Sequence, residues 1–337
     1  MTSPAKSPKS LPADLAPQVV GGDRRALAKA ITLVESAKPE HRADASALLS
    51  ELLPRTGKSV RLGITGVPGV GKSTFIEAFG SHLIGEGHRV AVLAVDPSSK
   101  RGGGSILGDK TRMETLARDE AAFIRPSPAG ATPGGVARRT REAMLVCEAA
   151  GFDVVIVETV GVGQAETAVA DLVDMFILLL APAGGDELQG IKRGVMELAD
   201  LLVINKADGD LKAAAQRTAA EYQNALGLMR PPSSTWFPPV LQASALEGGG
   251  VAKVWETVAD YRRVMGKAGA IEARRAEQAR AWMWSEITET LMGSFRNHAG
   301  VRRQVTKLEN QVASGKLAPT AAAEKLLEAF LDGAGKP

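Results

Sequence analysis

The sequence predicts an α/β fold built on a mostly parallel, doubly wound sheet. Short aliphatic runs alternate with helical stretches over about 190 residues, which is typical of layered α/β domains. These runs are apolar at every position rather than at every second one, as expected for strands covered by helices on both faces. Only 4% of the residues are aromatic, so we expect an aliphatic core, which favours layered packing over a small β-barrel.

The length, charge and cysteine content of the chain limit the classes of protein to which it can belong. The chain has 337 residues, 45% of them hydrophobic, which is enough for one sizeable core with appendages. Its 41 basic and 38 acidic residues leave a net charge of +3 without a long run of one sign, so no nucleic-acid or membrane partner is expected. The single cysteine, Cys147, excludes an internal disulfide. The strongly apolar run at 176–183 is too short to span a bilayer, and the N-terminus shows no secretory signal, so we expect a cytoplasmic protein.

We expect residues 1–57 to form a disordered lead and a helical segment. Residues 1–17 are rich in Pro, Ser and Lys, which is typical of disorder. A helix is predicted from Asp23, because Leu27, Ile31 and Val34 recur at helical spacing. A second helix is predicted at 39–53, before Pro54.

The predicted α/β domain covers residues 58–266. A glycine-rich turn and a helix to about residue 84 follow its first strand, and a helix from Val251 closes it. The strands are predicted at or near 61–65, 90–95, 154–157, 175–180, 201–204 and 241–246.

Residues 267–337 are predicted to form a separate helical region, with helices at 268–299 and 301–331. We expect its Trp282 and Trp284 to pack in the core or between domains, with anchoring of a dimer or partner as the alternative. Cys147 is expected to be a buried packing residue.

The segment at 66–73 fits the P-loop pattern of two glycines four residues apart followed by Lys and Ser. Glycines let backbone N–H groups surround phosphates, Lys72 would reach the β- and γ-phosphates, and Ser73 would offer its hydroxyl to Mg²⁺. A strand precedes the motif and a helix follows it, which is the context it requires. The residues predicted to bind phosphate are Gly66, Val67, Pro68, Gly69, Val70, Gly71, Lys72, Ser73 and Thr74.

A second motif, Asn-Lys-Ala-Asp at 205–208, directly follows a predicted strand. The Asp208 carboxylate would accept from N1–H and N2–H₂ of guanine, two donors that adenine lacks in that geometry. Asn205 would hold the base edge and the neighbouring loop, and the Lys206 stem would cover the base face. The loop formed by Ser244, Ala245 and Leu246 resembles the GTPase loop whose backbone N–H contacts guanine O6.

Three carboxylates are predicted to join Ser73 around Mg²⁺, which prefers oxygen ligands. Asp96 and Glu158 each end a predicted strand, and Glu158 takes the place of the usual Walker-B aspartate. Asp109 lies in a loop, where a solvated charge is the alternative.

Two polar stretches, residues 161–166 and 183–193, are candidates for segments that change conformation with the nucleotide. Gly161 or Gly163 would donate its N–H to the γ-phosphate, and Gln164 would orient the attacking water. Lys192, in the loop after the strand at 175–180, or an arginine would neutralise developing charge. A solvated loop without catalytic function is an equally open interpretation of both stretches.

Together the segments GVPGVGKST, AVDPSS, GGSILGDKTRM, VETVGVGQAE, GDELQGIK and NKAD resemble the MeaB/MMAA/ArgK family of P-loop GTPases, of the SIMIBI class. The resemblance implies a Mg²⁺-dependent GTPase that binds GTP and GDP and serves as a metallochaperone-type protein. Its partner would be an adenosylcobalamin-dependent acyl-CoA mutase, chiefly methylmalonyl-CoA mutase, whose cofactor loading it gates and which it protects or reactivates. The resemblance also implies a homodimer formed through the C-terminal helices, and a mutase-coupling switch at 185–192.

Two other functions remain open. Older naming in the family suggests a kinase of a lysine/arginine/ornithine transport system, although the guanine-type motif argues against an ordinary ATP-dependent kinase. A nucleotide-dependent metal-insertion protein would need a His/Cys cluster, whereas this chain has four scattered histidines and one cysteine.

Overall fold

The computed structural model describes two compact units, residues 1–278 and 279–337. Each is treated by itself below. The residues described are 11–36, 38, 40–95, 113–127, 133–159, 165–182, 193–228, 233 and 235–334.

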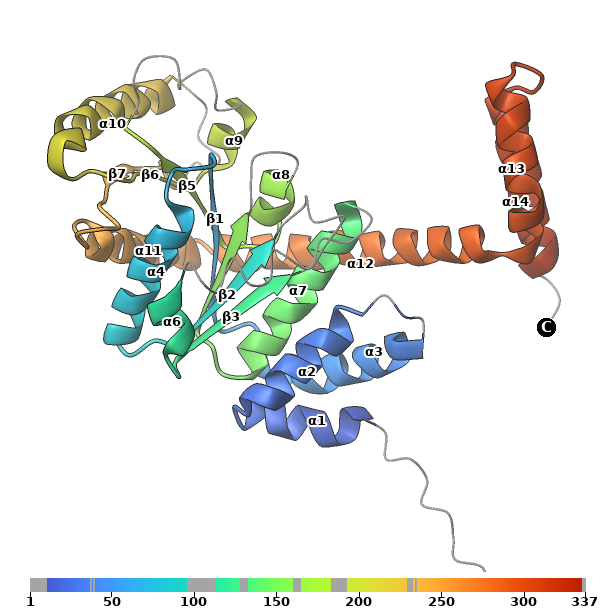
Figure 1. Cartoon of the computed structure of the whole chain (residues 1–337), viewed down its shortest axis with the longest axis horizontal. Coiled ribbons are helices and arrows are strands. Elements are labelled where there is room, and N and C mark those ends of the chain that lie inside the picture. The colour runs from blue at the N-terminus through green and yellow to red at the C-terminus, as the bar shows by residue number, and fades with distance from the viewer. Residues whose placement is uncertain are drawn as a thin grey trace, which may run out of the picture. The chain divides into compact units, whose positions relative to one another are not determined.

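The larger unit contains a seven-stranded sheet in the order β3-β2-β4-β1-β5-β6-β7. Every neighbouring pair is parallel, which confirms the predicted α/β fold with a parallel sheet (Figure 1). The strands are β1 (Val60–Gly66), β2 (Val90–Val95), β3 (Ala122–Ser127), β4 (Val154–Thr159), β5 (Met175–Leu180), β6 (Leu201–Ile204) and β7 (Val240–Gln242).

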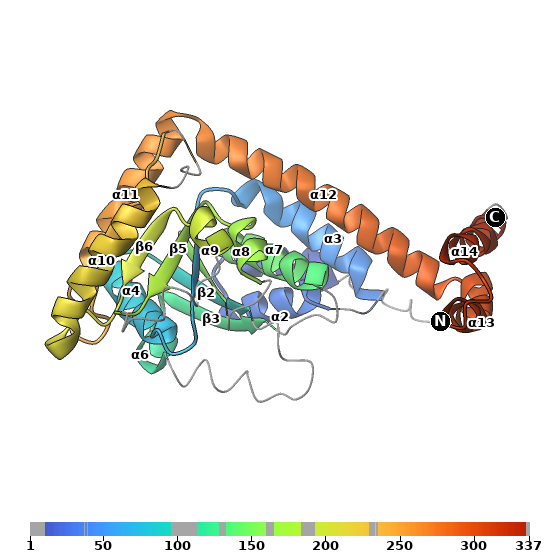
Figure 2. The ribbon, with the colours of Figure 1, turned by 90° about the horizontal axis from the view of Figure 1, so that it is seen from above.

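Helices cover both faces of this sheet (Figures 1 and 2). On one face, Phe75, Ile76 and Phe79 lie on one side of their helix because they recur at helical spacing. They share a core cluster with Leu62 and Ile64 of β1. The helices contributing to this layer are α4 (Lys72–Gly85), α6 (Glu114–Arg118) and α11 (Val251–Lys267). The opposite layer contains α7 (Pro133–Ala149), α8 (Ala165–Ala170) and α9 (Arg193–Leu198), while α10 (Lys212–Gly227) lies beside β6 and β7.

The N-terminal helices are α1 (Leu11–Val20), α2 (Arg24–Val34) and α3 (Glu40–Leu52). The expectation of a disordered lead over residues 1–17 is wrong for residues 11–17, which belong to α1. Leu15 and Val19 of α1 are buried, so packing stabilises the helix although it contains Pro17. Residues 1–10 lie outside the described part of the chain. Asp23 caps α2 by accepting hydrogen bonds from the backbone N–H groups of Arg25 (2.7 Å) and Ala26 (2.8 Å).

Strand β3 was not predicted from the sequence. It contains Arg125 and Pro126, which interrupt the apolar pattern used to find the other strands. Its place at the edge of the sheet, paired with β2, explains why proline is tolerated there.

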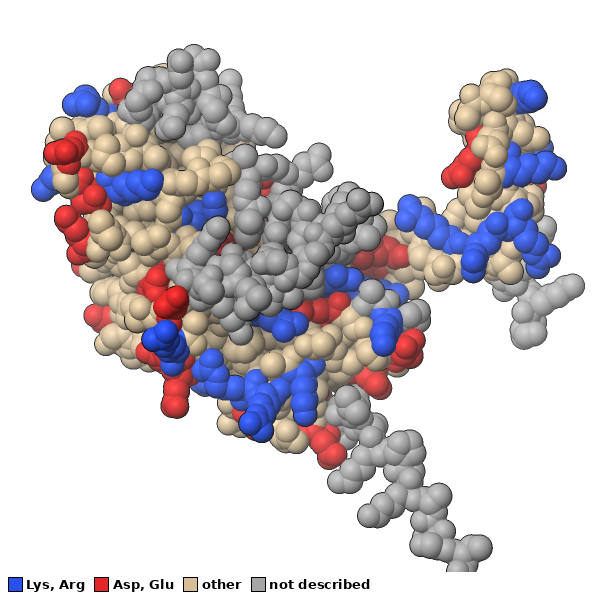
Figure 3. Space-filling view, viewed as in Figure 1, with Lys and Arg blue, Asp and Glu red and all other residues tan. Residues whose placement is uncertain are grey.

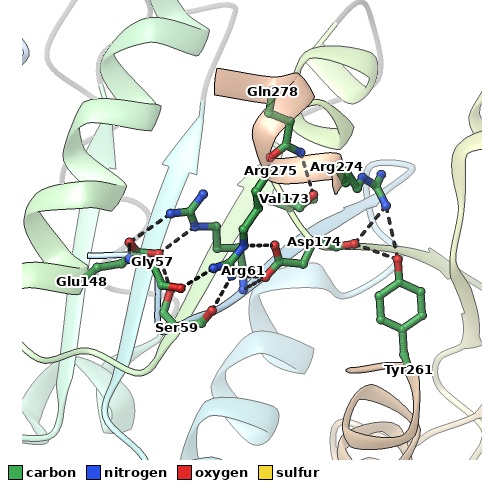
Figure 4. A network of polar contacts seen from close by, with 10 residues as sticks. All are labelled: Gly57, Ser59, Arg61, Glu148, Val173, Asp174, Tyr261, Arg274, Arg275 and Gln278. Carbon is green, nitrogen blue, oxygen red and sulfur yellow. Dashed lines mark hydrogen bonds and ion pairs between the residues drawn. The ribbon is translucent and has the colours of Figure 1, made fainter. Parts of the chain in front are cut away.

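The amino-terminal ends of the strands are tied to the first turns of α12 (Ala270–Asn297) by a network of ionic and polar contacts (Figure 4). Arg275 donates to both carboxylate oxygens of Asp174, at 2.7 and 2.6 Å, directly before β5. Arg274 donates to the backbone oxygen of Asp174 (2.9 Å), and Gln278 donates to the backbone oxygen of Val173 (2.9 Å). The start of α12 is therefore anchored to the edge of the sheet opposite the P-loop.

The smaller unit contains the rest of α12, α13 (Ala299–Ala313) and α14 (Pro319–Ala334). Phe295 and Phe330 lie 5.5 Å apart between ring centroids, edge to face. The expected packing role of Trp284 is wrong within this structure, because its side chain is 63% exposed.

None of the helices in the described ranges is long and apolar enough to cross a membrane. On the larger unit, basic and acidic side chains are interspersed over the visible described surface (Figure 3).

Candidate nucleotide-binding site

The P-loop segment connects β1 to α4, as the motif requires. Gly71 directly precedes α4 with a φ of 91°, a left-handed conformation that glycine adopts without strain. A Cβ at this position would lie 2.8 Å from Nδ2 of Asn205, so space as well as conformation requires glycine here. Val67 is partly buried and Val70 is buried, whereas Pro68, Gly69 and Thr74 are exposed.

The Lys72 side chain folds back over the P-loop backbone. Its Nζ donates to the backbone oxygens of Gly66 (2.7 Å) and Val67 (3.3 Å). Burial lowers the pKa of Lys72 below its ordinary value, and the negative charges of Glu158 and Glu166 oppose that shift. The ammonium group is thus held inside the loop that would surround a phosphate chain.

The side chains of Ser73 and Glu158 are hydrogen-bonded to each other. The Ser73 hydroxyl donates to Oε1 of Glu158 at 3.3 Å, and Glu158 is 3% exposed at the carboxyl end of β4. A hydroxyl and a carboxylate are hard oxygen donors and fit Mg²⁺, which completes its shell with phosphate oxygens and water. Within the described residues no group of three or more His, Cys, Asp or Glu side chains is placed to hold a metal ion.

Asn205 connects the P-loop to the loop after β7. Its Nδ2 donates to the backbone oxygen of Val70 (2.9 Å), and its Oδ1 accepts from the backbone N–H of Ala245 (3.2 Å). The side chain is buried, so both contacts are shielded from water. Lys206 adopts a left-handed φ of 57°, and its Nζ donates to the backbone oxygen of Gly69 (2.7 Å).

Asp208 and Ser244 are also brought together. The Ser244 hydroxyl donates to Oδ2 of Asp208 and accepts from the backbone N–H of Glu247 (3.0 Å). The backbone N–H of Ala207 donates to the backbone oxygen of Ala243 (3.0 Å), which joins the loops after β6 and β7. Leu246 is 83% exposed at the rim of this site.

The structure therefore gathers at one edge of the sheet most of the residues predicted to bind nucleotide. Five predicted site residues lie outside the described part of the chain: Asp96, Asp109, Gly161, Gln164 and Lys192.

Glu166 was not singled out from the sequence, although it is 3% exposed and its charge acts on Lys72. The available signal was its spacing, because Glu166 lies three and seven residues before the buried Val169 and Val173. A charged residue at the spacing of buried apolar ones is the pattern that could have drawn attention to Glu166.

Chemically, the arrangement suits phosphate binding with purine selection. The P-loop backbone and the start of α4 supply N–H groups and a positive dipole end, and Lys72 supplies a positive charge. The carboxyl edge of an open parallel sheet is where α/β proteins bind ligands, and here it also carries the Asp208 carboxylate.

Comparison with known proteins agrees with this geometry. A family model described as methylmalonyl Co-A mutase-associated GTPase MeaB matches residues 27–299. A putative GTPase of Caulobacter vibrioides is 59% identical over 93% of this chain and 96% of its own length. The methylmalonic aciduria type A homolog of Mus musculus is 51% identical over 93% of this chain and 78% of its own.

A solved structure titled LAO/AO transport system kinase matches with a TM-score of 0.74 and 41% identity. It covers 96% of this chain and 99% of its own. The predicted resemblance is thereby confirmed: the chain belongs to the MeaB family of P-loop GTPases associated with methylmalonyl-CoA mutase.

Proposed function

We propose that this GTPase is a chaperone of an adenosylcobalamin-dependent acyl-CoA mutase of the methylmalonyl-CoA type. It would gate the loading of adenosylcobalamin and protect or reactivate the mutase, with the GTP cycle as the checkpoint. The observation that carries this proposal is the family match over residues 27–299, which spans the nucleotide site and the whole of α12. The cytoplasmic location stays a prediction from the sequence.

In this proposal the nucleotide is GTP or GDP with Mg²⁺. The P-loop residues 66–74 would hold the phosphates, with Gly161 donating to the γ-phosphate, and residues 205–208 and 244–246 would hold the base. Ser73, Asp96, Asp109 and Glu158 would hold Mg²⁺. Gln164 would orient water, while Lys72 and Lys192 would neutralise charge in the transition state.

We also propose that the working form is a homodimer. Support comes from the part of α12 within the smaller unit, where Trp284, Ile287 and Leu291 are exposed at helical spacing. Apolar side chains gathered on one helix face are typical of interaction sites. The predicted division at 266/267 is part of this proposal, with the C-terminal helices as the dimer-forming region.

The direct test is co-purification with a methylmalonyl-CoA mutase from the same source. The tagged GTPase is immobilised with GDP, with a non-hydrolysable GTP analogue or without nucleotide, and retained mutase is quantified. We expect retention that differs by nucleotide state. Equal, background-level retention in all three conditions would contradict the proposal.

A second candidate is favoured by one observation, the 41% identity to a structure titled as a transport system kinase. A kinase would transfer the γ-phosphate to a protein acceptor. Labelled GTP and ATP, incubated with a binding protein of a lysine/arginine/ornithine transport system, separate the two functions: the chaperone releases inorganic phosphate from GTP, whereas the kinase labels the acceptor.

A further inference from the structure

Backbone pairing between β1 and β4 stops short of the carboxyl edge of the sheet. The last paired residues of these two strands are Ile64 and Glu158. On its other side β1 stays paired with β5 as far as Gly66, and β4 stays paired with β2 as far as Thr159. At the level of the nucleotide site, each of the two strands is therefore paired only with its outer neighbour in the described sheet.

A pair of side chains crosses this boundary. The hydroxyls of Thr65 and Thr159 lie 2.8 Å apart and are hydrogen-bonded to each other. Thr65 is 1% exposed and Thr159 is fully buried, so water does not compete for this bond. A hydrogen bond, unlike an apolar contact, requires a definite distance and direction. The pair therefore sets the spacing of β1 and β4 where their backbones no longer do so.

The two threonines are the immediate chain neighbours of site residues. Thr65 precedes Gly66, where the P-loop segment begins, and Thr159 follows Glu158. Glu158 accepts from the Ser73 hydroxyl at 3.3 Å, and these two oxygen donors fit Mg²⁺. Successive side chains of a strand point to opposite faces, so the threonine hydroxyls lie on the face opposite the Glu158 carboxylate. Their action on the ion would pass through the position of Glu158.

We propose that Thr65 and Thr159 are positioning residues, whose hydrogen bond fixes the spacing of β1 and β4 and so holds Glu158 where it can share Mg²⁺ with Ser73. The inference rests on the assignment of Ser73 and Glu158 to Mg²⁺ in the proposed function, and it does not depend on the mutase.

The test measures affinity for a non-hydrolysable GTP analogue by calorimetry, once with millimolar Mg²⁺ and once with EDTA. The double variant Thr65→Val and Thr159→Val removes the hydrogen bond and leaves neither hydroxyl without its partner. We expect the ratio of the affinities with and without Mg²⁺ to fall by roughly tenfold, as is usual when a residue that orients a metal ligand is lost. Urea denaturation of the nucleotide-free protein is the second readout.

The single variants separate positioning from stability. Thr65→Val or Thr159→Val leaves one buried hydroxyl without its partner, so each should unfold at a lower urea concentration than the double variant. If the pair were purely structural, the ratio would follow stability, and the double variant would recover both. If the pair positions Glu158, the ratio stays low in the double variant although stability returns.

Thr257→Val is the matched control. It removes the hydroxyl of another buried threonine, which donates to the backbone oxygen of Lys253 (2.8 Å) within α11. Its ratio should equal that of the unmodified protein. Thr159→Ser keeps the hydroxyl and should keep the ratio. If the double variant does not fold, Thr159→Val compared with Thr159→Ser carries the test.

Glu158→Gln tests the metal assignment separately. It removes the charge of the ligand itself, so it should lower the ratio at least as much as the double variant does. A lowered ratio in Glu158→Gln together with an unchanged ratio in the folded threonine variants overturns the inference and leaves the metal assignment intact. An unchanged ratio in Glu158→Gln overturns both.

Discussion

Asn205 shows how much of the site depends on single side chains. It donates to the P-loop at Val70 and accepts from Ala245, so one amide joins the P-loop to the loop after β7. Asp208 is aligned by Ser244 in the same way, since the hydroxyl donates to one carboxylate oxygen. Aligned acceptors of this kind discriminate strongly, because a ligand without the matching donors leaves them unsatisfied.

Asp208→Asn should therefore change which purine binds. The amide would donate where guanine also donates, so GTP affinity should fall by roughly a hundredfold or more, while xanthosine triphosphate gains affinity. Calorimetry with both nucleotides checks this, with Asp210→Asn, an exposed neighbour, as the control. Unchanged preference for guanine would refute the assignment of Asp208.

Lys72→Ala should abolish GTP hydrolysis with the fold intact. The ammonium group already lies inside the P-loop, and its loss removes a transition-state charge partner worth roughly 10²–10³-fold in rate. Phosphate release assays measure the effect, circular dichroism checks the fold, and Lys58→Ala at an exposed position is the control. Retained turnover would contradict the phosphate assignment.

At the scale of elements, α12 is anchored to the sheet through ion pairs. Arg61 of β1 donates to Glu148 at 2.7 and 3.0 Å, and Arg275 contacts Asp174 twice. Asp174 also accepts from the backbone N–H of Arg61 (3.0 Å), so the two ion pairs form one network (Figure 4). A buried pair of this kind is costly to break from one side, because the remaining charge loses its partner.

Arg275→Ala should lower the free energy of unfolding by about 3 kcal/mol, because the buried Asp174 carboxylate would lose two charged hydrogen bonds. Urea denaturation measures this change. Arg263→Ala is the control, since its pair with Asp260 is exposed and should contribute less than about 1 kcal/mol. Equal losses in the two variants would show that the network does not stabilise the fold.

A comparison of the predicted with the observed strands shows which elements the apolar pattern of the sequence could predict. Four of the predicted strands were apolar at every position, as is typical of buried parallel strands, and all four occur in the sheet. The strand predicted at 61–65 also occurs, although it contains Arg61 and Thr65. Strand β3 escaped detection because Arg125 and Pro126 are tolerated at a sheet edge. Glu166 and the network at Asp174 were not predicted, because the sequence alone does not show whether packing will bury a charged residue.

For the whole molecule, the exposed helix face of the smaller unit raises the question of self-association. Trp284 and Leu291 are 63% and 57% exposed, which leaves much of two large apolar side chains in contact with water. Covering this face with a second copy would remove that area from water.

The double variant Trp284→Asp and Leu291→Asp should shift a dimer to a monomer, because the charges would be buried at the interface. Size-exclusion chromatography with light scattering gives the mass. Ser285→Asp, with a charge on another side of the same helix, should leave the dimer intact. A monomeric unmodified protein, or a dimer that persists in the double variant, would contradict the proposed dimer surface.

The central claim concerns the whole α/β unit: the carboxyl edge of its sheet binds one guanine nucleotide and excludes adenine. Calorimetry of the purified protein with GDP and with ADP, both with Mg²⁺, tests this most directly. We predict one GDP per chain, bound at least roughly 10³-fold more tightly than ADP. Equal affinity for the two nucleotides, or no GDP binding at all, would contradict the account.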